Sequence, residues 1–133
     1  MEPSAPRRLL LDTHVLLWWL EGGTRLRPEA RAVLSAPGTE GFVSAASVWE
    51  AAIKRALGKL DSPPDLDAQV LREGFRPLPV TLAHAHAVNT LPAFDDHRDP
   101  FDRLLVAQAK AEGLVLLTRD AHLVCYGIAV MAA

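Results

Sequence analysis

Short apolar runs alternate with amphipathic segments along this chain, which predicts strands alternating with helices. Leu9 to Leu11 and Leu114 to Leu117 are unbroken apolar runs, typical of strands buried on both faces of a parallel sheet. Strands are predicted at 8–12, 41–44, 114–118 and 128–131. Helices are predicted at 14–21, 28–35, 45 or 48 to 57, 65–73, 81–89, 100–112 and, as a short helix or turn, 120–126. The pattern predicts an α/β fold with a mainly parallel sheet.

The remaining segments lack a clear period. Residues 75–80 carry too many prolines for an interior strand, so we expect an edge strand or an extended connection there. We expect an irregular loop from Leu91 to Asp99 and a loose polar tail from Met1 to Pro6. No repeats or linker interrupt the sequence, which predicts a single domain over residues 1–133.

Acidic residues follow the predicted strands or open the helices after them. Asp12 ends the first strand, Glu50 lies near the start of a helix, Asp99 and Asp102 flank the start of another, and Asp120 follows the last long apolar run. In a parallel sheet these points lie at one edge, where bare carboxylates would repel one another. A hard cation such as Mg²⁺, which takes oxygen ligands, would relieve that repulsion.

Each of these acids also has a structural interpretation. Asp12 is equally well placed to cap the helix that follows it, and Asp120 is another candidate N-cap. Ser47 and Glu50 form a capping box if Ser47 is the N-cap, but not if Ser44 is.

A structural interpretation accounts less well for one of the two acids at the start of the long helix than for the other. Asp99 before Pro100 is a good N-cap, with a metal ligand as the alternative. Asp102 shares a helical face with Leu105 and Val106, and an acid on a buried stripe needs a partner or a metal. The structural interpretation is therefore weakest for Asp102.

Several other polar residues are candidates for binding substrate. Arg103 and Arg119 stand beside acids and are suited to holding a phosphate, and Lys54 is a further phosphate contact. Thr13 and Thr118, next to the predicted strand ends, complete the set of predicted substrate contacts.

Composition limits the function classes. The 133 residues are 50% hydrophobic with a net charge of -2, which argues against a simple basic nucleic-acid binder unless a metal reverses the local field. Cys125 is the only cysteine, so no internal disulfide can form and a cytoplasmic location is expected. No apolar stretch reaches the ~20 residues of a membrane span.

Four segments resemble the PIN domain, specifically the VapC-type toxin ribonucleases of prokaryotic toxin–antitoxin pairs. They are 10–18, 44–60 with Trp49-Glu50 and Gly58-Lys59-Leu60, 97–109, and 117–120. The resemblance implies a Rossmann-like, five-stranded parallel sheet between two layers of helices. It also implies Mg²⁺-dependent RNA cleavage, with Mn²⁺ as a possible substitute, dimerisation, and inhibition by a small VapB-like antitoxin.

By motif position, Asp12, Glu50, Asp102 and Asp120 match the acidic residues of that family, as metal ligands and catalytic groups. Asp99 is shared by the subgroup with the sequence Asp-Pro-Phe-Asp-Arg. Many relatives carry another acid at the position of His122, so a second metal site is in question. The apolar first helix, with Trp18-Trp19, independently favours a homodimer.

Two other functions compete with a ribonuclease. A phosphatase with a nucleophilic Asp12 would need a second aspartate at position 14, where this chain has His14. A non-catalytic PIN-like module that binds RNA or protein is the stronger rival, and the presence of all four acids argues against it.

Overall fold

The computed structural model describes residues 7–94 and 99–133. The predicted tail over residues 1–6 and residues 95–98 of the predicted loop lie outside this part of the chain. Within it, no helix is long and apolar enough to cross a membrane.

The described residues form one five-stranded sheet in which every strand pair is parallel, in the order β3-β2-β1-β4-β5. The two long apolar runs therefore pair side by side, with Leu10 opposite Leu116. The strands are β1 (Arg8–Leu11), β2 (Glu40–Ser44), β3 (Arg76–Leu78), β4 (Val115–Thr118) and β5 (Val130–Ala132).

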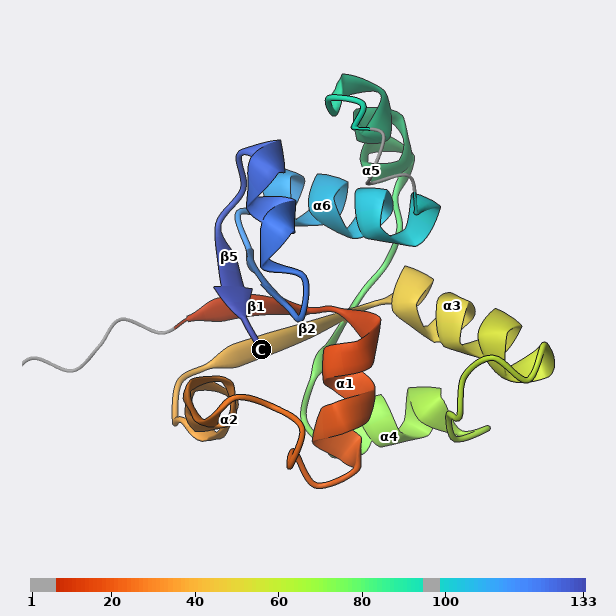
Figure 1. Ribbon diagram of the computed structural model, residues 1–133, viewed down its shortest axis with the longest axis vertical. Helices are drawn as coiled ribbons and strands as arrows, with labels where there is room; N and C mark the ends of the chain where they lie inside the picture. Colours follow the sequence, from red (N-terminus) through yellow and green to blue (C-terminus); the bar gives the residue numbers. More distant parts are fainter. Residues whose placement is uncertain (1–6, 95–98) are drawn as a thin grey trace, which may run out of the picture.

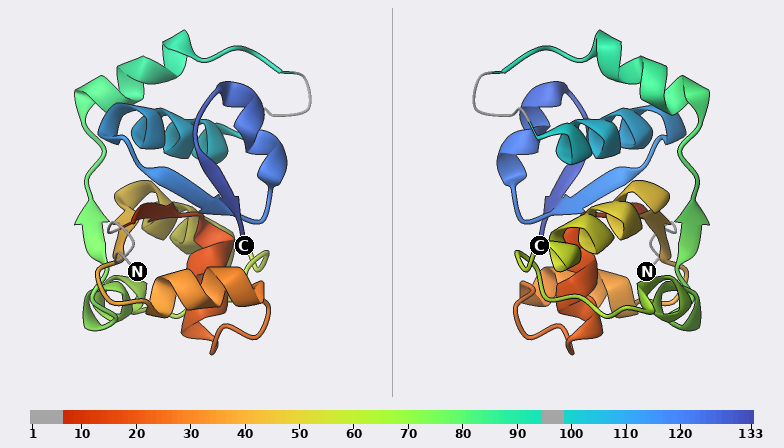
Figure 2. Two further views of the ribbon diagram at one scale, coloured as in Figure 1. Left: turned by 90° about the vertical axis from the view of Figure 1, so that its left-hand side faces the viewer. Right: turned by 90° about the vertical axis from the view of Figure 1, so that its right-hand side faces the viewer.

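Helices cover both faces of the sheet and complete three layers, as predicted (Figures 1 and 2). On one face lie α1 (Thr13–Leu20), α2 (Pro28–Ser35), α3 (Ala45–Ala56) and α4 (Leu66–Arg72). On the other lie α5 (Leu82–Ala87), α6 (Pro100–Glu112) and the 3-10 helices η1 (Val88–Thr90) and η2 (Ala121–Tyr126).

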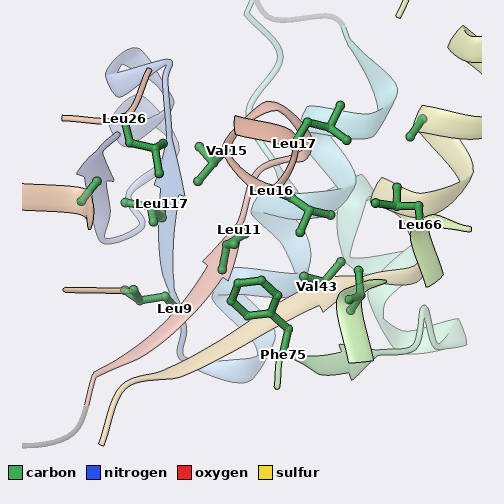
Figure 3. Close-up of a cluster of buried hydrophobic side chains, with 13 residues drawn as sticks. Leu9, Leu11, Val15, Leu16, Leu17, Leu26, Val43, Leu66, Phe75 and Leu117 are labelled. Carbon is green, nitrogen blue, oxygen red and sulfur yellow. The ribbon is translucent and has the colours of Figure 1, made fainter. Parts of the chain in front are cut away.

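The alternating side chains of β1 divide the core in two. Leu9 and Leu11 point into the cluster beneath α1 to α4, where Leu16 and Phe75 pack against them (Figure 3). Leu10, between them, belongs to the opposite cluster against α6 and η2. All three leucines are fully buried, because a central strand of a parallel sheet is covered on both faces.

One close approach fixes how β2 packs. The ring of Phe75 lies over Gly41, and a Cβ at that position would stand 2.6 Å from the Phe75 Cδ1 atom. Glycine is therefore required in this strand because the neighbouring ring occupies the space of a side chain.

The structure confirms most predicted elements, with most ends within one residue of the prediction, and it corrects three predictions by more than that. Helix α3 begins at Ala45, with Ser44 as its N-cap, so the alternative start at Val48 is wrong. The predicted helix over 81–89 is divided, because α5 ends at Ala87 and continues as the tighter η1. The last strand begins at Val130 rather than at Ile128, because Ile128 directly follows the Gly127 turn and is buried beside η2.

Candidate active site

The five predicted acids gather at the edge of the sheet where its strands end. Asp12, Glu50 and Asp120 follow β1, β2 and β4, and those three strands are adjacent and parallel. Helix α6 runs back across the sheet to enter β4, so its N-terminus, with Asp99 and Asp102, returns to the same edge (Figure 1). Burial raises the pKa of Asp102, and the negative charges of the other four acids raise it further, so all four lie within electrostatic reach of Asp102.

Asp12 is held from both of its carboxylate oxygens. Its Oδ1 accepts the backbone N–H of His14 at 3.3 Å, which makes Asp12 the N-cap of α1. Its Oδ2 accepts the hydroxyl proton of Thr118 at 2.7 Å. The side chain is 7% exposed. The carboxylate thus caps the helix and also faces the acidic edge, so the two interpretations of Asp12 do not exclude each other.

Glu50 is a buried carboxylate with two partners. Oε1 accepts the hydroxyl proton of Thr13 at 2.6 Å, and Oε2 is ion-paired with Lys54 one turn further along α3. Because Ser44 caps the helix through the backbone N–H of Ala46, Glu50 lies too deep to belong to a capping box. The capping-box interpretation of Glu50 is therefore wrong.

Asp99 and Asp102, at the start of α6, have different surroundings. Asp99 Oδ1 accepts the backbone N–H groups of Phe101 at 2.8 Å and Asp102 at 3.1 Å, so Asp99 is the N-cap of α6. Burial, followed by the nearby carboxylates, raises the pKa of Asp102 to about 7. At Asp102, burial first and neighbouring negative charge second therefore disfavour the ionised form.

Asp120 is more accessible than Asp12 and Glu50, with 37% of its side chain exposed. Its Oδ1 accepts the backbone N–H of His122 at 3.1 Å, and its own backbone N–H donates to the Thr118 hydroxyl at 3.0 Å. The Nδ1 atom of His122 lies 3.4 Å from the same carboxylate oxygen.

The two threonines support the carboxylates in the structure. Thr13 and Thr118 are both buried and donate their hydroxyl protons to Glu50 and Asp12, respectively. These hydrogen bonds position the two carboxylates, and the role of both threonines as substrate contacts stays a prediction.

The predicted phosphate contacts have different surroundings. Lys54 is paired with Glu50, and that hydrogen bond raises the pKa of Lys54 above its ordinary value. Arg119 is exposed and close enough for its charge to lower the pKa of His14. The guanidinium of Arg103 donates to the Pro92 carbonyl at 2.9 Å and to the Tyr126 hydroxyl at 3.2 Å. Through these contacts, Arg103 links α6 to the segments beside it. They give no support to the prediction that Arg103 contacts a phosphate.

His14 is a member of the site that the sequence did not single out. It is half-buried, and its pKa is lowered by burial and by Arg119 against the raising effects of Asp12 and Glu50. A neutral imidazole therefore stands among the acids. The sequence signal that could have identified His14 as a site residue is its position two residues after Asp12, at the start of α1.

The donor set fits a hard cation held partly through water. Among the described residues, no three acidic, histidine or cysteine side chains are grouped so that they alone could hold a metal ion. The donors are nevertheless carboxylate oxygens, and Asp12 retains lone pairs beyond its two hydrogen bonds. One turn before Glu50, the buried hydroxyl of Ser47 has no hydrogen-bond partner in the described chain. Mg²⁺ matches such a site, because it is usually bound by one or two carboxylates and several waters.

Solved structures of low sequence identity share this fold. The chain of VapBC2 from Rickettsia felis, in a crystal structure with a promoter DNA fragment, matches with a TM-score of 0.69 and 11% identity, over 94% of this chain and 98% of that one. DNA-bound VapBC from Salmonella typhimurium matches with a TM-score of 0.67 and 16% identity, over 95% and 98%. FitAcB from Neisseria gonorrhoeae matches with a TM-score of 0.63 and 22% identity, over 92% and 96%.

Comparison at the level of sequence identifies the family. No curated protein matches the chain. The sequence model of the PIN domain, in contrast, matches residues 9–127, which is most of the chain and includes all five acids of the site. With its three-layer fold and parallel sheet, this chain belongs to the PIN domain family.

Proposed function

We propose that this protein is a metal-dependent endoribonuclease and the toxin of a VapBC-type toxin–antitoxin pair. The observation that carries the proposal is the crowding of five acids at one edge of the sheet, where burial and then the charges of the other four raise the pKa of Asp102 to about 7. Such crowding destabilises a chain without a ligand and is relieved by a divalent cation. A site that holds a cation among oxygen donors is suited to hydrolysing phosphodiesters.

The proposed ligands of the ion are Asp12 and Asp102, with Glu50 and Asp120 reaching it directly or through water. Bound Mg²⁺, or Mn²⁺ in its place, would supply an activated water and offset the charge that develops on the scissile phosphate. Thr118 keeps the Asp12 carboxylate oriented through its hydrogen bond. One ion is proposed, because His122 stands where a further acid would support a second.

The protein's own groups would handle the proton and the substrate backbone. Glu50 or Asp120 would orient the attacking water and accept its proton. Arg119, exposed beside the acids, is the proposed contact to a backbone phosphate, and such a contact positions RNA without reading its sequence. Lys54 would join it if a phosphate displaced its pairing with Glu50.

Partners are proposed from the names of the similar structures. Two of these are described as VapBC complexes, and another, from Klebsiella pneumoniae, as a toxin–antitoxin complex, with 20% identity and a TM-score of 0.62. We propose that a small VapB-like antitoxin inhibits this chain in the cytoplasm. We also propose a homodimer, although Trp18 and Trp19 pack partly against the core of their own chain. Sedimentation of antitoxin-free protein at micromolar concentration tests the dimer, and a monomer would contradict it.

The reaction is tested by incubating antitoxin-free protein with structured and unstructured RNA, in Mg²⁺ and in EDTA. We expect the parent protein to cleave RNA only in the presence of the metal, and we expect Asp12→Asn to abolish cleavage. Asp61→Asn, which changes an exposed acid outside the site, is the matched control and should cleave normally. Cleavage that survives EDTA or Asp12→Asn would contradict the mechanism. The absence of cleavage with any RNA and metal would favour the non-catalytic binding module.

A further inference from the structure

Trp49 is the one exposed aromatic side chain of this protein. All eight aromatic residues lie in the described chain, and seven are buried or half-buried, whereas Trp49 is 61% exposed. Tryptophan is usually well buried, because its large ring removes much apolar area from water. An indole left in solvent is therefore a candidate for contact with a ligand.

A second ring holds this indole in place. Phe101 and Trp49 meet edge to face, with ring centroids 5.4 Å apart and planes 70° apart. Phe101 is half-buried, and the Asp99 carboxylate accepts its backbone N–H, so it is itself fixed at the start of α6. Although Phe101 contacts it, Trp49 remains 61% exposed and so is open to a further contact.

The pair stands at the rim of the acidic edge. Trp49 immediately precedes Glu50 on α3, and Phe101 immediately precedes Asp102 on α6. Neighbouring positions of a helix point about 100° apart, so the indole flanks the carboxylate without covering it. If a ligand bound with one of its phosphates at the acidic edge, the chemical group attached to that phosphate would therefore lie near Trp49.

We propose that Trp49 is a stacking platform for an unpaired base next to the scissile phosphate, and that Phe101 holds it in position. The platform selects single-stranded RNA, because the faces of bases inside a duplex are already stacked. It does so with little sequence preference, because every base has a π-face. This inference rests on the proposed function for its substrate, but its binding step can be measured without cleavage.

The kinetic test compares Trp49→Leu, which keeps an apolar side chain without a ring, with Trp49→Phe, which keeps a π-face. On a short unstructured RNA we expect Trp49→Leu to raise KM about tenfold, with little change in kcat. Trp49→Phe should restore most of the loss. Leu57→Ala removes another exposed apolar side chain, 62% exposed at the far end of α3, and should behave like the parent. Melting curves of all four proteins check that the fold is retained.

The binding test uses the Asp12→Asn background, so that RNA is not cut. Single-stranded RNA should quench tryptophan fluorescence, and adding Trp49→Phe should remove the quenching although Trp18 and Trp19 remain. Duplex RNA of the same sequence should quench weakly. If the parent protein cleaves no RNA, the proposed function fails, and this measurement alone decides the stacking.

Three results would overturn the inference. One is an unchanged KM for Trp49→Leu in an active, folded enzyme. Another is equal quenching by duplex and single-stranded RNA. The third is a change of sedimentation from dimer to monomer in Trp49→Leu with KM unchanged, which would assign Trp49 to a protein interface.

Discussion

Thr118 donates its hydroxyl proton to Oδ2 of Asp12 at 2.7 Å, although 106 positions separate the two residues. They meet because β1 and β4 are neighbours in the sheet and end at the same edge. The same hydroxyl accepts the backbone N–H of Asp120 at 3.0 Å. One buried side chain thus positions two of the proposed ligands before any ion arrives.

Removing that hydroxyl should weaken metal binding without unfolding the protein. Valine has nearly the shape of threonine but cannot donate to Asp12, so the carboxylate would lose its fixed orientation. We expect Thr118→Val to lower Mg²⁺ or Mn²⁺ affinity about 10–100-fold, the usual effect of losing such a supporting group. Calorimetric titration measures this, with Thr90→Val on η1 as the matched control. Equal affinities in parent and Thr118→Val would contradict the positioning role.

Asp102 should make the metal-free protein less stable as the pH rises. Its pKa is about 7 in the folded chain, against an ordinary value of 3.8, so the folded state holds the proton more tightly. The resulting stabilisation is complete below pH 3.8 and is lost as the pH rises through 7. We expect the stability advantage of Asp102→Asn over the parent to grow between about pH 4 and 7, by roughly 2–4 kcal/mol, and then to level off.

Thermal and urea unfolding in EDTA test this, with Asp61→Asn as the control. A constant difference between Asp102→Asn and the parent across this pH range would show that Asp102 ionises normally. Added Mg²⁺ should reverse the order of stability, because only the parent retains the proposed ligand.

Lys54 should stabilise the fold through Glu50. Glu50 is 4% exposed, so loss of its cationic partner leaves a buried charge with only the Thr13 hydroxyl. We expect Lys54→Met to cost about 1.5 kcal/mol, at the low end for a hydrogen bond to a charged group because the Lys54 side chain is 30% exposed. Urea denaturation of Lys54→Met, Glu50→Gln and the double variant measures the coupling. Additive effects would refute it, and Arg55→Met controls for loss of positive charge.

Gly41 should not tolerate alanine while Phe75 is present. The added Cβ would lie 2.6 Å from the Phe75 ring, closer than unbonded atoms approach, so one of them must move. We expect Gly41→Ala to destabilise the protein by about 1–3 kcal/mol, the usual cost of overpacking a core. Gly41→Ala combined with Phe75→Leu should recover part of that loss in urea unfolding. No recovery would mean that the backbone, and not the ring, limits this position.

The sequence predicted the central fold well because its signals are local. The apolar run of β1 and the caps of α6 each depend on adjacent residues, and both appear where expected. The predicted position of strand β5 was wrong by two residues at its start. This edge strand has only three residues, so its position depends on pairing with β4 and not on its own sequence pattern.

At the site, the sequence predicted which acids gather but not what surrounds them. The convergence of Asp12 and Asp102 followed from the parallel sheet. The side-chain partners did not, because Arg103 is long enough to reach the Tyr126 hydroxyl and the carbonyl of Pro92. The ion pair between Glu50 and Lys54 could have been predicted from the sequence, because the two residues lie four positions apart on one helix.

The crowded carboxylates also bear on how long the chain survives after synthesis. Local opening at the start of α6 separates Asp102 from its neighbours, so repulsion in the ion-free protein favours the open form. Proteases cut opened chains, and a bound cation lowers the open population in proportion to its concentration above Kd. Through these carboxylates, the supply of divalent cations would set the degradation rate of the protein as well as its activity.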